Sequence, residues 1–170
     1  MLVIYNIISI SVVLMMIQLI YIRDYTLLFG ELLCTIIQYC SKKITTGWYP
    51  DIFKRPNGAT DCNLFNYGGK SDHCSGFPSG HVASITFFME MLVLRNNVDV
   101  LYNKTTYYVP ILLVAYSRYM KKCHNIIQIF AGYLLGYGVA NILYKYDDDI
   151  KQFVKSKISY FFNIEDNEKN

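Results

Sequence analysis

Charged side chains are scarce in this chain. Asp, Glu, Lys and Arg make up 17% of its 170 residues and hydrophobic residues make up 53%, whereas an ordinary soluble domain carries about 25% charged residues. The formal net charge of +3 is also too small to indicate a nucleic-acid partner. The chain is long enough for one domain, and its composition favours an integral membrane protein.

The patterns that bind metal ions are absent as well. The five cysteines show no metal-ligand spacing, and the acidic residues form no cluster of the kind that a metal site needs. We therefore expect no metal and no other cofactor. Cys62 and Cys74 share one polar segment and would form a disulfide if that segment faces an oxidising compartment, but free thiols are an equally good interpretation.

Five apolar stretches predict an all-α membrane bundle with about five transmembrane helices. Residues 1–22 contain no charged side chain and are long enough to cross a bilayer. The four further stretches are residues 25–41, 82–94, 106–117 and 125–144. In the last of them, Gly132, Gly136 and Ala140 recur every four residues and predict close packing against another helix.

The chain divides into a membrane domain and a tail. Residues 1–146 form the membrane domain, and their polar loop, residues 42–77, is long enough to be functional. Glu31 and Glu90 lie inside apolar stretches, where we expect each to make a structural hydrogen bond. Residues 147–170 are polar, and apolar positions at helical spacing within them fit either a short helix on an anionic membrane surface or a solvated tail.

Three polar motifs border the apolar stretches: Arg55-Pro56, Pro78-Ser79-Gly80-His81, and Ser117-Arg118 followed by His124. Ser79 is predicted to cap the helix that follows, because its hydroxyl can accept a bond from a free backbone N–H. Gly80 lets a ligand approach the backbone closely, and a helix N-terminus attracts anions. The motifs therefore combine an anion site with two arginines and two histidines, which suits phosphate chemistry.

In this order and spacing, the motifs resemble those of the type 2 phosphatidic acid phosphatase superfamily, over roughly residues 50–140. The resemblance implies a metal-independent membrane phosphatase that hydrolyses a lipid phosphate monoester or a polyprenyl diphosphate. It gives His124 the role of nucleophile, through a phosphohistidine, and His81 the role of acid. The phosphate-binding residues that it implies are Arg55, Ser79, Gly80 and Arg118.

Two positions depart from the pattern of that family. Trp48 stands where the family has a Lys, and Lys54 or Lys43 is a candidate substitute for the cation. Gln128 stands where the family has an orienting Asp. Its amide can accept a hydrogen bond but brings no charge, so Gln128→Asp is expected to raise the rate if Gln128 is a weak orienting residue. Alternative orienting groups are the loop carboxylates of Asp51, Asp61 and Asp72.

These departures leave a second hypothesis, a weakened or inactive relative that binds anionic lipid headgroups or is a structural membrane protein. In both hypotheses the partners are membrane lipids and the bilayer, with no nucleic acid, and protein partners are unknown from the sequence. A multi-pass protein is expected. The distribution of Lys and Arg slightly favours a cytosolic tail, and the resemblance favours an active site on the non-cytosolic face.

Overall fold

The computed structural model describes residues 24–46, 51–60, 62, 74–96 and 104–167, and the side chains of 96, 104–106 and 158–167 are not described. Within these residues the chain forms five α-helices and no β-strand, which confirms the all-α class. The helices are α2 (Tyr25–Thr45), α3 (Gly80–Asn96), α4 (Lys104–Met120), α5 (Ile126–Tyr144) and α6 (Asp147–Asn167).

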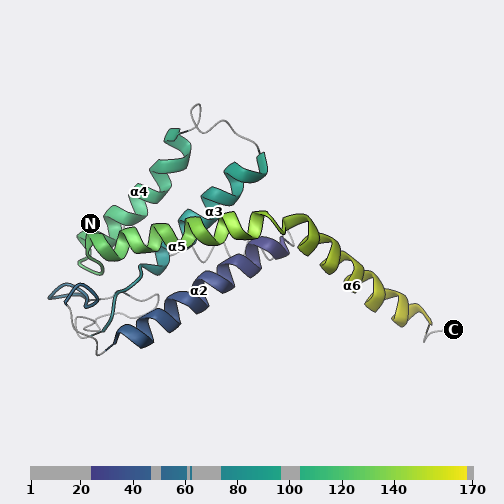
Figure 1. The fold of residues 1–170 in the computed structure, drawn as a ribbon, viewed down its shortest axis with the longest axis horizontal. Helices are drawn as coiled ribbons and strands as arrows, with labels where there is room; N and C mark the ends of the chain where they lie inside the picture. Colours follow the sequence, from purple (N-terminus) through teal and green to yellow (C-terminus); the bar gives the residue numbers. More distant parts are fainter. Residues whose placement is uncertain (1–23, 47–50, 61, 63–73, 97–103, 168–170) are drawn as a thin grey trace.

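Helix α5 runs through the middle of the bundle, and α3 packs along it more extensively than any other helix does (Figure 1). Helix α2 runs in the opposite direction to α5, and α4 ends close to the point where α5 begins. Helix α6 continues beyond the end of α5 and projects away from the other helices. The bundle therefore has two ends, one where α3 and α5 begin and one where they finish.

The close contact between α3 and α5 depends on the stripe of small residues. A Cβ atom added at Gly132 would lie 2.4 Å from the carbonyl oxygen of Ser79, and one added at Gly136 would lie 2.2 Å from that of Ala83. These neighbours are backbone atoms, which cannot rotate away as the end of a side chain can. The predicted role of the stripe in helix packing is confirmed.

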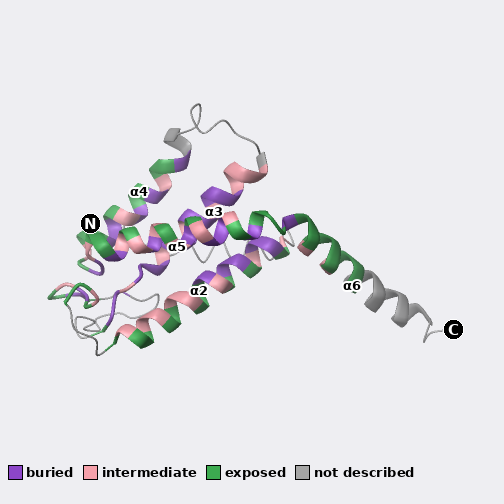
Figure 2. Ribbon diagram, in the orientation of Figure 1, coloured by how far each residue is buried: buried purple, intermediate pink, exposed green. Residues whose placement is uncertain are grey.

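The buried core lies between α2, α3 and α5 (Figure 2). Its members are Leu27, Cys34, Phe87, Met91, Val139, Ala140 and Leu143. Both predicted carboxyl contacts occur next to this core: Glu31 bonds to Ser84 across α2 and α3, and Glu90 accepts from the hydroxyl of Tyr107 over 2.8 Å. The two glutamates thus link neighbouring helices, as expected.

The outward surfaces of α4 and α5 are strongly apolar. The exposed large side chains there include Leu112, Leu113, Tyr116, Ile126, Ile127, Phe130 and Leu134. Among the described residues, α5 is the one helix that is long and apolar enough to cross a membrane, by length and composition. The stretch 1–22 lies outside the described residues, so the bundle of five membrane helices stays a prediction.

An ionic cluster closes the end of the bundle where α5 finishes. Arg95, at the end of α3, contacts Asp24 and Asp147 at 2.6 Å each. Asp24 also caps α2 by accepting from the backbone N–H of Leu27, and Asp147 also pairs with Lys151. The cluster therefore fixes the starts of α2 and α6 against the end of α3.

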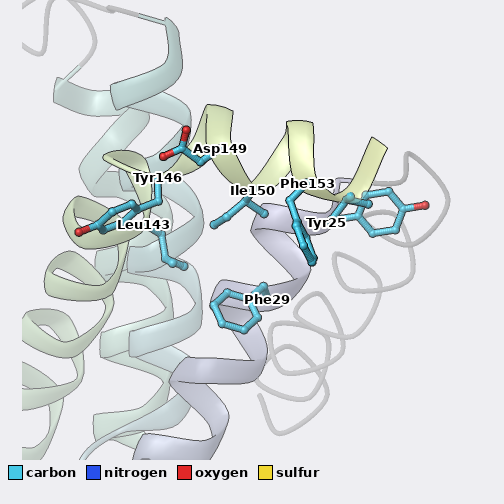
Figure 3. Close-up of a pocket in the computed structure, with 8 residues that line it drawn as sticks. Tyr25, Phe29, Leu143, Tyr146, Asp149, Ile150 and Phe153 are labelled. Carbon is cyan, nitrogen blue, oxygen red and sulfur yellow. The ribbon is translucent and has the colours of Figure 1, made fainter. Parts of the chain in front are cut away.

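The tail forms a helix of 21 residues, α6, which is longer than the short helix that its apolar spacing predicts. Where α6 leaves the bundle, an apolar groove of about 710 Å³ opens between α2, α5 and α6 (Figure 3). Its lining includes Tyr25, Phe29, Leu143, Ile150 and Phe153. The groove lies at the end of the bundle opposite to the three polar motifs. Whether α6 lies on a membrane surface stays a prediction.

Candidate active site

The three polar motifs lie together at the end of the bundle where α3 and α5 begin (Figure 1). The backbone N–H of Ser79 donates to the carbonyl oxygen of Gln128 over 2.9 Å, which joins the start of α3 to α5. The segment that carries Arg55 is held beside them, since the backbone N–H of Gly76 donates to Phe53 O over 2.8 Å. Segments that are far apart in the sequence thus form one site.

His124 lies just before α5 and is buried, with 2% of its surface exposed. Its Nδ1 atom lies 2.9 Å from the carbonyl oxygen of Gly76 and 3.3 Å from Oε1 of Gln128. Because a carbonyl oxygen only accepts hydrogen bonds, Nδ1 carries the proton. The Nε2 atom therefore keeps its lone pair, as a nucleophile requires.

The charges that act most strongly on His124 are all positive. Burial lowers the pKa of its imidazole well below the usual range, and the charges of Arg118, Arg55 and Lys42 lower it further. Arg118 and Arg55 are themselves buried, with 1% and 5% exposed. Burial lowers the pKa of Arg55 too. The site thus holds a neutral imidazole among cations, an arrangement that suits an anionic ligand.

Lys42 is the site residue that the sequence motifs do not identify. It lies in the last turn of α2, and its charge acts on His81 and on His124. Its Nζ donates to Oε1 of Gln38 over 3.2 Å, and Gln38 packs against Gly80, where an added Cβ would lie 1.7 Å from that oxygen. The one signal for Lys42 in the sequence was its position directly after the apolar stretch 25–41.

The two lysines proposed as substitute cations lie in other surroundings. Lys54 is exposed and pairs with Asp51 at 3.1 Å. Lys43 is exposed, with its Nζ 5.7 Å from the centre of the Tyr39 ring. Trp48, at the position of the family's Lys, lies outside the described residues. Lys42, rather than Lys54 or Lys43, is therefore the lysine whose charge acts strongly on His124.

The start of α3 differs from the prediction in one respect. Ser79 occupies the capping position, because its carbonyl accepts from the backbone N–H of Ala83. Its hydroxyl, however, is fully buried and has no hydrogen-bond partner among the described residues. The contact with α5 explains this, since the Ser79 backbone bonds to Gln128 and packs against Gly132. The hydroxyl consequently does not cap the helix.

The structure contains a disulfide, but it joins a different pair of cysteines from the pair considered in the sequence. Cys62 bonds to Cys123, with 5.3 Å between their Cα atoms, and Cys74 is a free, exposed thiol. Packing of distant segments decides the pairing: Cys62 and Cys123 share a small buried cluster, and the Arg118 guanidinium donates to the Cys62 carbonyl. The disulfide therefore lies directly beside His124.

Of the three aspartates considered as orienting groups, Asp51 is the one that lies within the described residues, and no hydrogen bond joins it to His124 there. Asp51 is exposed and pairs with a lysine. Asp61 and Asp72 lie outside the described residues, as does His73. The Gly76 carbonyl makes the shorter contact with Nδ1 of His124, and Gln128 makes the longer one.

Two histidines and several cations thus lie near one another at the end of the bundle where α3 and α5 begin, an arrangement that suits a phosphate-like anion. The family model described as PAP2 superfamily matches residues 25–152, and the chain belongs to that superfamily. Membership supports phosphatase-type activity in general and an association with membranes, which its members typically have. Comparison with curated proteins gives no match, and comparison with solved structures gives none either.

Proposed function

We propose that this protein is a membrane lipid phosphatase that hydrolyses a phosphate monoester or a polyprenyl diphosphate through a phosphohistidine at His124. The observation that carries the proposal is the setting of His124. Its Nδ1 is bonded to a carbonyl, its ring is neutral, and the charges around it are positive. A neutral imidazole is a nucleophile, and cations stabilise the negative charge of a phosphoryl group in transfer.

In the proposed reaction the lone pair of His124 Nε2 attacks phosphorus, and the bond between phosphorus and the leaving oxygen breaks. His81, in the first turn of α3, enters this step as the imidazolium, gives its proton to that oxygen and becomes neutral. Water then attacks the phosphohistidine and gives a proton to His81, the bond between phosphorus and His124 Nε2 breaks, and phosphate leaves. Arg55, Arg118 and Lys42 neutralise the phosphoryl oxygens, and the start of α3 supplies backbone N–H groups and the Ser79 hydroxyl.

A lipid substrate is favoured by the position of the site along α5. Helix α5 has 19 residues, so its length is about 28 Å, close to the thickness of the hydrocarbon core of a bilayer. The site lies at one end of this helix and the ionic cluster of Arg95 lies at the other. A bundle that crosses the bilayer along α5 would hold the site at the level of lipid headgroups.

The test is phosphate release by the purified protein in detergent, with phosphatidic acid and a polyprenyl diphosphate as substrates. We expect turnover that EDTA does not inhibit, and His124→Ala should abolish it without unfolding the protein. A radiolabelled substrate should leave an acid-labile, base-stable phosphoprotein in the parent. Inhibition by EDTA that magnesium reverses would overturn the proposed mechanism.

The alternative is a relative that binds anionic headgroups without hydrolysing them. The amide at position 128, where the family has a carboxylate, is the observation that favours it. In that case the parent would bind vesicles containing phosphatidic acid, Arg55→Ala or Arg118→Ala would weaken binding, and no phosphate would be released.

A further inference from the structure

Gln128 bonds to all three segments that make up the candidate active site. Its Nε2 donates to the carbonyl oxygens of Ile52 and Lys54, each over 2.8 Å. Its backbone carbonyl accepts from the N–H of Ser79 over 2.9 Å. Its Oε1 lies 3.3 Å from Nδ1 of His124. The side chain is completely buried, so water cannot replace any of these bonds at low cost.

The orientation of the amide follows from its neighbours. Two carbonyl oxygens face Nε2, whereas the backbone N–H of Asn125 faces Oε1 over 3.3 Å. The reverse orientation would set oxygen against two carbonyls and the NH₂ group against an N–H. A carboxylate at this position would also leave the carbonyl oxygens of Ile52 and Lys54 without a donor, because it has no N–H group.

We propose that Gln128 is a positioning residue that holds the Arg55 segment against His124, and that the site requires an amide at this position. The inference rests on the proposed function and explains how the site works without the family's carboxylate. The Gly76 carbonyl already selects the proton-bearing nitrogen of His124. The residue at position 128 then holds the Arg55 segment in place, and this role requires a hydrogen-bond donor.

The close packing around Gly76 supports separate roles for the Gly76 carbonyl, which orients His124, and for Gln128, which positions the Arg55 segment. A Cβ added at Gly76 would lie 2.4 Å from Oε1 of Gln128 and 3.0 Å from Cγ of Arg55. Gly76, whose carbonyl orients His124, therefore packs against both the amide of Gln128 and the side chain of Arg55. A change in the amide is transmitted directly to both the nucleophile and the cation.

The proposal predicts the opposite of the rate gain expected when Gln128 is viewed as a weak orienting residue. Gln128→Glu keeps the shape of the side chain and removes both donors. We expect kcat/KM for phosphatidic acid to fall by about tenfold or more, because two buried carbonyls lose their partners. KM should rise as well, since Arg55 is displaced.

The pH profile separates this positioning role from a purely structural one. A carboxylate beside His124 favours the charged imidazole, so Gln128→Glu should move the acid limb of the profile to higher pH. Gln128→Met has a similar length, no donor and no charge, and should lower the rate without moving that limb. The matched control is Gln152→Glu, the same change at an exposed residue of α6, which should leave rate and profile unchanged.

Binding of inorganic phosphate, measured by calorimetry, keeps the test valid if the parent shows no turnover. The parent and Gln152→Glu should bind alike, and Gln128→Glu and Gln128→Met should bind more weakly. A parent protein that binds phosphate but does not turn over would contradict the proposed function alone.

If a variant fails to fold, Gln128→Asn, which keeps the amide, should show a smaller loss of phosphate binding. A rate gain in Gln128→Glu, or unchanged phosphate binding in both variants, would overturn the positioning role.

Discussion

At the scale of single residues, the environment of His124 is the feature with the clearest consequences. Burial and neighbouring cations lower its pKa, and a backbone carbonyl decides which nitrogen carries the proton. Neither effect requires a carboxylate. In the proposed reaction, the surrounding backbone prepares His124 as the nucleophile, together with cations that also suit an anionic substrate.

A titration of the His124 imidazole by NMR tests this directly. Because its folded-state pKa lies well below 6.5, the ring should stay neutral as the pH falls from about 7.5 to about 5.5. The unfolded chain takes up a proton in this range and the folded protein does not, so the free energy of unfolding should decrease as the pH falls below about 6.5. A transition of the ring at or above the usual pKa would contradict the environment described for it.

Lys42 and Lys43 form a matched pair of neighbouring residues for a second prediction. Lys42→Ala removes a charge that acts on both site histidines, and should raise KM by about tenfold, as expected for a partly screened cation. Lys43→Ala removes an exposed lysine and should change KM little. Kinetics on phosphatidic acid in mixed micelles would measure both. Equal effects of the two changes on KM would show that Lys42 does not belong to the site.

The motif residues could be predicted from the sequence because three short motifs, in a fixed order, resemble those of a phosphatase family. Arg55, His81, Arg118 and His124 were predicted in this way, and the structure gathers their segments at one end of the bundle. Lys42 could not be found, because it reaches the site from the end of another helix. The pairing of Cys62 with Cys123 could not be predicted from the sequence either, because it depends on tertiary packing between residues 61 positions apart.

At the scale of elements, the pair formed by α3 and α5 supports the site. The start of α3 is joined to α5 through Ser79, and the glycine stripe determines how closely the two helices approach. The sequence predicted this stripe correctly because small residues at a spacing of four have few other uses in an apolar helix.

Gly136→Ala should destabilise the protein by about 1–3 kcal/mol, because its methyl group would meet the Ala83 carbonyl of α3. Gly138→Ala in the same helix is the control: a Cβ there meets nothing within 4 Å. Thermal unfolding in detergent would compare the two variants. A control that is as unstable as Gly136→Ala would show that helix packing is not the cause.

At the scale of the whole molecule, a disulfide and an ionic cluster hold opposite ends of the bundle. The disulfide joins residues 61 positions apart beside His124, and the cluster of Arg95 closes the other end. Disulfides persist in oxidising compartments, and the face of the membrane on which the site lies stays a prediction.

Loss of the disulfide should affect both stability and activity. Cys62→Ser or Cys123→Ser should lower the free energy of unfolding by about 2–4 kcal/mol, through the longer free loop of the unfolded chain. Turnover should fall too, because Arg118 bonds to the Cys62 carbonyl. Cys74→Ser, which changes an exposed free thiol, should have neither effect. Activity that survives in both disulfide variants would show that the bond is not needed at the site.

The location of the site at the end of an apolar helix has a kinetic consequence. A lipid and an enzyme that share one surface meet by lateral diffusion, and the bulk volume of the sample has no part in their encounter. The relevant concentration is then the mole fraction of substrate in that surface. Adding inert detergent at a fixed amount of lipid should dilute the substrate in two dimensions and slow the reaction, although its molarity is unchanged. A water-soluble phosphate ester would show no such dilution, so the two kinds of substrate should obey different rate laws on the same protein.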